Sequence, residues 1–213
     1  VSGDEELTEF EHDKFPYKKS GILLGAVFDN SEPTFSPERG VNLSLGFKLN
    51  GHVFASTFNY TRLWGEIRTY YDLGYVTMAF RIMAGGIHSS DTSKFVPVED
   101  RFYSGGSTSI RGWRRSRLGP QRGNGTPLGG KSIFETNIEA RYHLFWRLGV
   151  VGFLEAGNVW RPSYSYHLND LGYAAGTGLR IETPIGPVRI DVGFPLWNDK
   201  RSPEFFISVG QAF

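Results

Sequence analysis

Residues 131–145 alternate between apolar and polar side chains with a period of two. One face carries Phe134, Thr136, Ile138, Ala140, Tyr142 and Leu144, and the other carries Glu135, Asn137, Glu139, Arg141 and His143. Because successive side chains of a strand point to opposite faces, this run predicts a β-strand between two different environments. A soluble sandwich would bury the apolar face, whereas a membrane barrel would turn it to lipid and enclose the charges in a polar lumen. The alternation alone leaves both architectures open.

Similar alternation recurs along most of the chain. Residues 41–49 place Val, Leu and Phe on one face and Asn, Ser, Gly and Lys on the other, and the following Asn50-Gly51 is typical of a tight hairpin. No run of about 18 apolar residues occurs, so the sequence contains no transmembrane helix. We expect about ten antiparallel strands by the same pattern, near residues 21–29, 41–49, 53–63, 66–73, 75–86, 131–145, 149–160, 171–182, 187–195 and 204–213.

Three further features favour a transmembrane barrel. The expected strands are about 9 to 12 residues long, which is enough to cross a bilayer at a tilt, whereas soluble strands centre near about 5 or 6. Short and long connections mostly alternate, as in outer-membrane barrels, although a brief link near residues 64–66 interrupts this order. Aromatic residues occur at the expected strand ends, where an interfacial girdle would lie: Trp64, Tyr70, Tyr71, Phe145, Trp146, Trp160 and Trp197.

The segment from Arg101 to Arg117 has neither strand alternation nor a helical stripe. It contains arginines at 111, 114, 115 and 117 together with several glycines, and it belongs to a long loop expected over residues 87–129. Such a loop is either a mobile surface loop or one that folds back onto a polar interior able to neutralise its charge. We expect an N-terminal loop or leftover connection at 1–20 and a barrel domain at 21–213 that contains this long loop, and the loop composition alone leaves both positions of the loop open.

Other chemistry finds little support in the sequence. The formal net charge is +1, so nothing indicates a nucleic-acid partner, and the absence of cysteine excludes thiol catalysis and Cys-based metal sites. Residues 125–132 match the phosphate-loop pattern, but a polar loop precedes them and a period-2 strand follows, which is the wrong context. Glu135 and Glu139 share a face but lie roughly 13 Å apart along a strand, too far for a glycosidase pair. We expect no enzyme activity, no metal site and no cofactor.

Four motifs resemble one family. Ser109-Ile110-Arg111-Gly112-Trp113 resembles the loop motif of the outer-membrane protein assembly and two-partner secretion superfamily, the bacterial surface antigen family of BamA, TamA and FhaC. Residues 153–157, Phe-Leu-Glu-Ala-Gly, resemble its F-x-D-x-G strand motif, and residues 184–191 resemble its penultimate hairpin. The terminal Ser208-x-Gly210-x-x-Phe213 is similar to the signal on last strands of outer-membrane barrels. Here Glu155 replaces the usual Asp, and Trp113 replaces Phe or Tyr.

The resemblance implies an all-β fold, namely an antiparallel transmembrane β-barrel of which this chain is the C-terminal part. The family barrel has sixteen strands preceded by periplasmic domains, and these 213 residues have room for neither. In the family, the long loop folds into the barrel and its arginine meets an acidic residue of the inner wall. We therefore expect Arg111 to pair with Glu155, with Asp191 or Glu139 as secondary acceptors.

The resemblance also assigns roles around this pair. Gly112 would let the loop lie against the wall, Trp113 and Phe153 would pack beside Arg111, Ile110 completes the loop motif, and Gly157 would leave space for the loop backbone. The closing strand, whose partner first strand is absent from this chain, would present Phe205, Ile207, Val209, Gly210 and Phe213.

The function implied is that of an outer-membrane protein assembly factor, which inserts or translocates β-barrel or secreted proteins. The location would be an outer membrane of the Gram-negative bacterial type. Expected partners are outer-membrane lipid and lipopolysaccharide, unfolded outer-membrane or secreted substrates, and accessory lipoproteins or periplasmic domains. A passive diffusion pore, or the barrel anchor of an enzyme whose catalytic domain lies elsewhere, are the alternatives.

Overall fold

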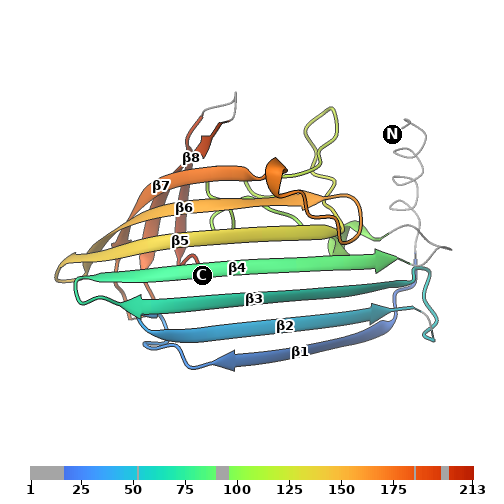
Figure 1. Ribbon diagram of the computed structural model, residues 1–213, viewed down its shortest axis with the longest axis horizontal. Coiled ribbons are helices and arrows are strands. Elements are labelled where there is room, and N and C mark those ends of the chain that lie inside the picture. Colours follow the sequence, from blue (N-terminus) through green and yellow to red (C-terminus); the bar gives the residue numbers. More distant parts are fainter. Residues whose placement is uncertain (1–16, 52, 90–95, 185, 198–201) are drawn as a thin grey trace.

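A computed structural model describes residues 17–51, 53–89, 96–184, 186–197 and 202–213 (Figure 1). Most of the expected N-terminal loop at 1–20, and residues 90–95 of the expected long loop, lie outside the described residues. The strands are β1 (Gly21–Asp29), β2 (Gly40–Asn50), β3 (Tyr60–Asp72), β4 (Val76–Ser89), β5 (Ser132–Phe145), β6 (Leu148–Trp160), β7 (Gly172–Ile181), β8 (Val188–Leu196) and β9 (Glu204–Val209). Two short 3₁₀ helices, η1 (Val98–Asp100) and η2 (Leu168–Asp170), lie in connections. No helix of the described residues is long and apolar enough to span a membrane.

The strands form one nine-stranded antiparallel sheet in sequence order, so β1 and β9 are its edges within the described residues. The sheet curves strongly, and in Figure 1 β8 runs behind β5 to β7 with the β4–β5 connection between them. This arrangement confirms the predicted all-β antiparallel fold.

The prediction of separate strands at 53–63 and 66–73 was wrong. Residues 51 and 53–59 lie outside the strands, Asn50 Nδ2 at the end of β2 donates to the carbonyl of Phe58 at 2.7 Å, and β3 then runs unbroken through Gly65. Gly65 stays in the strand because it is in register with Leu45 of β2 and Ala84 of β4. With one strand instead of two, the expected tight hairpin at Asn50-Gly51 is a longer loop, and the link near 64–66 does not exist.

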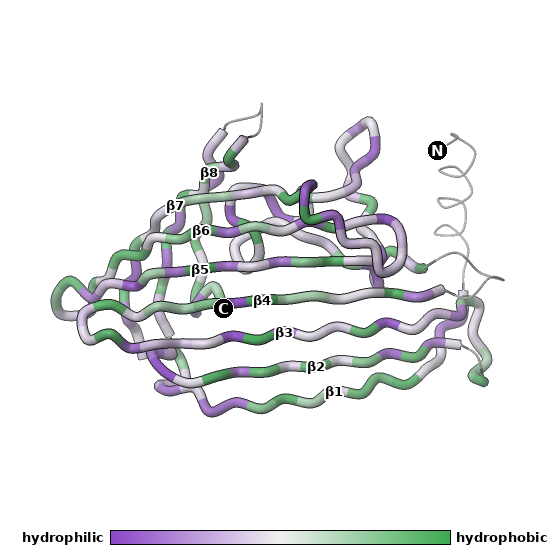
Figure 2. Tube along the Cα trace, in the orientation of Figure 1, coloured by the Kyte–Doolittle hydropathy of each residue, from purple (hydrophilic) through white to green (hydrophobic). Residues whose placement is uncertain are grey.

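The two faces of the sheet differ sharply in polarity. The convex, outward face exposes large apolar side chains from every strand, for example Leu45 of β2 (51% exposed), Leu154 of β6 (58%) and Ile207 of β9 (78%). The concave face buries charged ones, including Glu139 and Asp191, which are both 0% exposed. Figure 2 shows the resulting alternation of hydropathy along the strands. Apolar residues that face outward around a buried ionic interior are the inverse of a soluble sandwich and fit a lipid-exposed sheet.

The connections separate into two ends of the sheet. One end carries the β1–β2, β3–β4, β5–β6 and β7–β8 connections, and the other carries the β2–β3, β4–β5, β6–β7 and β8–β9 connections. With the two predicted strands merged into β3, the short β3–β4, β5–β6 and β7–β8 connections lie at one end, but the long β1–β2 connection lies there too, so the predicted one-sided order holds only in part. The longest connection, between β4 and β5, lies at the second end and folds over the concave face.

The expected aromatic girdle is only partly present. Tyr71, Phe145, Trp146 and Trp197 are exposed at strand ends, with exposed fractions of 56%, 70%, 88% and 80%. Trp64, Tyr70 and Trp160 are different. The ring of Trp64 covers Gly46 inside the sheet, and Tyr70 and Trp160 are only 4% and 5% exposed.

The last strand ends earlier than the sequence predicted. β9 stops at Val209, and Gly210 adopts a φ of +88°, a left-handed conformation that glycine permits at little cost. Phe205, Ile207 and Val209 face outward, but Phe213 turns into the interior and packs with Tyr70 in a buried cluster. The interior of the sheet is therefore filled from this end by the residues after β9, not by a continuous strand.

Candidate functional site

The β4–β5 connection is a structured loop on the concave face of the sheet. We call residues 96–131 the inner loop. Two backbone bridges hold its limbs together, Phe102 to Gly130 and Ser104 to Leu118. Phe102 also fills the space over Gly85 of β4, where a Cβ atom would lie 2.6 Å from the ring. The inner loop therefore has a defined shape that can carry a side chain to a defined place on the wall.

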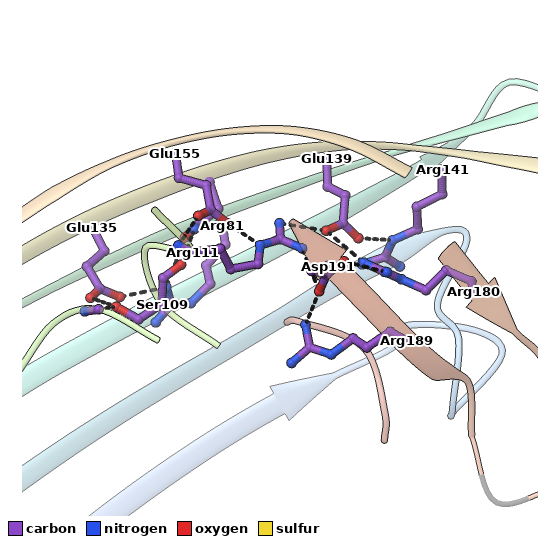
Figure 3. Close-up of polar contacts among 12 residues, drawn as sticks. Arg81, Ser109, Arg111, Glu135, Glu139, Arg141, Glu155, Arg180, Arg189 and Asp191 are labelled. Carbon is purple, nitrogen blue, oxygen red and sulfur yellow. Dashed lines mark hydrogen bonds and ion pairs between the residues drawn. The ribbon is translucent and has the colours of Figure 1, made fainter. Parts of the chain in front are cut away.

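Arg111 is the side chain at the centre of this contact. It is 0% exposed, and its Nε donates to Glu155 Oε1 of β6 at 2.7 Å (Figure 3). Its Nη2 lies 2.8 Å from Glu139 Oε2 of β5, an ion pair without hydrogen-bond geometry, and its Nη1 lies 3.4 Å from Asp191 Oδ2 of β8. The backbone N–H of Arg111 also donates to Glu155. One arginine thus joins three strands of the wall.

Three further arginines share these carboxylates. Arg141 Nε lies 2.8 Å from Glu139, and Arg180 Nη1 lies 2.6 Å from Asp191. Arg189 is also near Asp191, at 3.4 Å. By contrast, Glu155 forms an ion pair with Arg111 and, in the described part of the chain, with no other residue. Buried charges are tolerated when they are paired and hydrogen-bonded, and Glu155 depends on the inner loop for that pairing.

The motif residues beside Arg111 divide between two environments. The ring of Phe153 lies under the guanidinium, with the Arg111 Cζ atom 3.5 Å from its centroid, which gives a cation–π contact. Ile110 and Trp113 pack instead with Leu118 and Ala174 in an apolar cluster. Trp113 was expected beside Arg111, but the structure places it against the start of β7, where its ring approaches Gly172.

Two glycines allow the loop backbone to touch the wall. A Cβ atom on Gly112 would lie 2.8 Å from Ala174 Cβ and 3.0 Å from the backbone of Pro195. A Cβ atom on Gly193 of β8 would lie 2.1 Å from the carbonyl oxygen of Arg111. Gly157 was expected to provide this space, but the atoms nearest its position belong to β5, so that prediction was wrong. The close approach occurs at β8, two strands away.

Several contributors escaped the sequence reasoning. Gly193 carried no motif that pointed to the loop, and Gly176 of β7 makes room for the ring of Phe153, which lies 2.3 Å from where its Cβ atom would be. Strand alternation places Glu135 on the same face as Glu139, but nothing in the sequence connects it with the loop. Strand alternation could have listed all inward-facing residues, but only the path of the inner loop decides which of them it meets.

The start of the inner loop is attached separately, through η1, to residues 17–19 and to the ends of β2 and β3. Asp100 of η1 is 5% exposed and accepts hydrogen bonds from Lys19 Nζ at 2.7 Å, from Lys48 and from Tyr60. Burial would raise the pKa of Asp100, but these hydrogen bonds and the positive charges outweigh it, so its pKa lies below the ordinary value. Burial would lower the pKa of Lys19, but its hydrogen bonds to Asp100 and Glu99 and their negative charges outweigh this effect. The pKa of Lys19 therefore lies above its ordinary value.

We expect acid to release this attachment. A carboxyl whose pKa is lowered in the folded state contributes stability above its ordinary pKa and loses it as the pH falls through the folded value. The contact between residues 17–19 and η1 should therefore hold at neutral pH and weaken below about pH 4. Spin labels at Lys18→Cys and Val98→Cys should show a narrow distance distribution that broadens in acid. In Asp100→Asn it should already be broad at pH 7, and an unchanged distribution in that variant would contradict the prediction.

Comparison with known proteins identifies the family. The profile of the Omp85 superfamily domain matches residues 3–213, which is nearly the whole chain. The chain belongs to the Omp85 superfamily. Membership confirms the family suggested by the four motifs, and it supports the predicted location in an outer membrane.

Similar proteins come from bacteria and from eukaryotes. The chain is 26% identical over 193 residues to "Outer membrane protein assembly factor BamA" of Nitratidesulfovibrio vulgaris, covering 87% of this chain and 24% of that protein. It is 28% identical over 182 residues to "Sorting and assembly machinery component 50 homolog" of Xenopus tropicalis, covering 76% of this chain and 38% of that protein. The chain therefore spans well under half the length of these relatives.

A solved structure agrees with the fold. The crystal structure of BamA from Haemophilus ducreyi lacking POTRA domains 1–3 matches with a TM-score of 0.77 at 17% identity, over 97% of this chain and 47% of that one. At this identity the match concerns architecture alone. It shows that the nine-stranded sheet has the architecture of part of that longer chain.

Proposed function

We propose that this Omp85 chain forms part of a machine that assembles β-barrel proteins in an outer membrane. The observation that carries the proposal is the docking of Arg111 against the carboxylates of β5, β6 and β8, with a lipid-facing exterior around it. The relatives named above are assembly components, and family membership makes the same general activity the simplest assignment. Its substrates would be unfolded outer-membrane proteins, or secreted proteins in a translocation variant of the same activity.

The physical basis of the proposal is a sheet with available edges and a fixed interior. A free strand edge presents unpaired N–H and C=O groups that can pair with an incoming strand. β9 has only six residues, and Phe205, Ile207 and Val209 on its outer face are 61–78% exposed. The docked inner loop would hold the neighbouring wall in shape while such an edge pairs with substrate. Outer-membrane lipid, lipopolysaccharide, and accessory lipoproteins or periplasmic domains are the partners that we infer for this activity.

A reconstituted assembly assay tests this function. The protein is placed in liposomes, an unfolded outer-membrane β-barrel protein is added, and its conversion to a protease-resistant, heat-modifiable form is followed. We expect conversion at least about tenfold faster than in protein-free liposomes, which corresponds to about 1.4 kcal/mol of barrier. Equal rates in both would overturn the proposal. Liposomes that contain an unrelated closed barrel serve as the control for bilayer perturbation.

The alternatives make different predictions for the same preparation. A diffusion pore should give steady conductance in planar bilayers and no acceleration of folding. The inner loop occupies the concave side of the sheet, which argues against a wide, open channel there. If the chain were the barrel anchor of an enzyme, the activity would depend on residues outside this chain. In the described ranges, no group of three or more His, Asp or Glu is arranged to hold a metal ion.

A further inference from the structure

Glu135 lies on the inner face of β5, on the loop-bearing side of Glu139, and is 2% exposed. Two serine hydroxyls of the inner loop donate to the same carboxylate oxygen: Ser104 Oγ at 2.6 Å, and Ser109 Oγ. Arg81 Nη1 of β4 lies 2.8 Å from the other oxygen (Figure 3). A buried carboxylate of the wall is therefore neutralised by the wall itself and offers its second oxygen to the loop.

Further hydrogen bonds hold Ser109 at its contact with Glu135. Asn137 Nδ2 donates to the carbonyl oxygen of Ser109 at 2.9 Å, and the N–H of Gly105 donates to the Ser109 hydroxyl at 2.9 Å. Arg81, which balances the charge of Glu135, is itself held by Glu66 of β3 at 2.8 Å and donates to Asn137 Oδ1 at 2.9 Å. Ser109 is thus bound at both its side chain and its backbone, two residues before Arg111.

The Glu135 contact is electrostatically distinct from the Arg111 contact. Around Arg111 the loop supplies the cation and the wall supplies the acids, whereas around Glu135 the wall supplies both charges and the loop supplies only hydroxyls. In the described part of the chain no ion pair links Arg81 or Glu135 to Arg111, Glu139, Glu155 or Asp191. Asn137 lies between the two groups, since it is in register with Glu155.

We infer that Glu135 is a positioning residue that holds the 104–109 segment of the inner loop on the wall independently of Arg111. Its role deepens the proposed assembly function, because it fixes where the Arg111 motif begins. Loss of either contact alone should free only its own segment, and the loop should leave the wall only when both are lost. A hydroxyl–carboxylate contact is well suited to such a task because it can open and reform without exposing an unpaired cation on the loop.

Hydrogen exchange of the backbone amides, measured by mass spectrometry on the protein in lipid discs, tests this inference without using assembly activity. In Glu135→Leu, exchange within residues 104–109 should rise by about tenfold or more, since a hydrogen bond to a charged group is lost. Residues 110–112 should keep most of their protection. Glu204→Gln is the matched control, because Glu204 also contacts a loop arginine, Arg114, whose side chain is 77% exposed.

A second variant separates positioning from simple stabilisation. Glu135→Leu leaves Arg81 with less compensating charge, so the sheet itself should become less stable. Adding Arg81→Met removes the positive charge of Arg81 and should restore much of the melting temperature. If Glu135 positions the loop, the exchange of residues 104–109 stays fast in the double variant. If exchange returns to the parental rate together with the melting temperature, or never changes in Glu135→Leu, the inference is wrong. Neither result depends on whether the assembly assay succeeds.

Discussion

Replacing Arg111 with Met is expected to lower the free energy of unfolding by about 3–5 kcal/mol, the range seen when one partner is removed from a buried ionic contact. Arg111 is 0% exposed and reaches three carboxylates, so its removal leaves buried negative charge with less positive charge to balance it. Urea titration of the protein in lipid, followed by heat-modifiable migration, measures the change. Arg114→Met is the control. Arg114 is 77% exposed, so its pair with Glu204 should contribute at most about 1 kcal/mol.

Most of the stability lost in Arg111→Met should come from Glu155, which loses its ion pair. Glu139 keeps Arg141, and Asp191 keeps Arg180, but Glu155 keeps only hydrogen bonds such as the one from the backbone N–H at position 111. We therefore expect Arg111→Met/Glu155→Gln to recover a substantial part of the lost stability, and Arg111→Met/Asp191→Asn to recover little. Equal recovery in the two double variants, or a loss below about 1 kcal/mol in Arg111→Met, would count against the described geometry.

The sequence predicted the sheet well because strand alternation is local. Residues 134–144 alternate without interruption, and the structure has one strand there, in which Glu135, Asn137, Glu139 and Arg141 are buried on the inner face, whereas His143 near the strand end is exposed. The same rule failed at Trp64 and Gly65, where a short, glycine-containing stretch appeared to be a turn. In the structure both neighbouring strands continue in register past Gly65, and pairing on two sides overrides the weak propensity of one glycine.

The site was less accessible to sequence reasoning because it depends on the path of a loop. The motif resemblance implied the contact between Arg111 and Glu155, and the structure brings these two residues together. It did not indicate that Ser109 would meet Glu135, or that Gly193 rather than Gly157 would receive the loop backbone. No periodicity encodes such contacts, since they join residues more than 25 positions apart through an aperiodic segment.

Gly193→Val should displace the inner loop even though every charged residue is kept. The nearest atoms to a Cβ at position 193 are the carbonyl oxygen and carbon of Arg111, at 2.1 and 2.5 Å, and backbone atoms of a docked loop cannot move aside as a flexible side chain can. Overpacking of this kind costs typically about 1–3 kcal/mol or more, and here relief requires Arg111 to withdraw from its carboxylates. We expect amide exchange at residues 110–112 to become about tenfold faster or more. This corresponds to a destabilisation of the docked loop by about 1.4 kcal/mol or more.

The matched control is Gly152→Val on the outer face of β6, where no atom lies within 4 Å of the added Cβ. Valine favours strands, so this variant should be as stable as the parent or slightly more stable. Gly193→Ala should give an intermediate displacement, since its single methyl group already meets the Arg111 carbonyl. If Gly193→Val exchanges like Gly152→Val, the loop does not rest on β8. The ionic cluster would then have to form without the backbone contact. That contact would no longer explain how Arg111 reaches carboxylates on three strands.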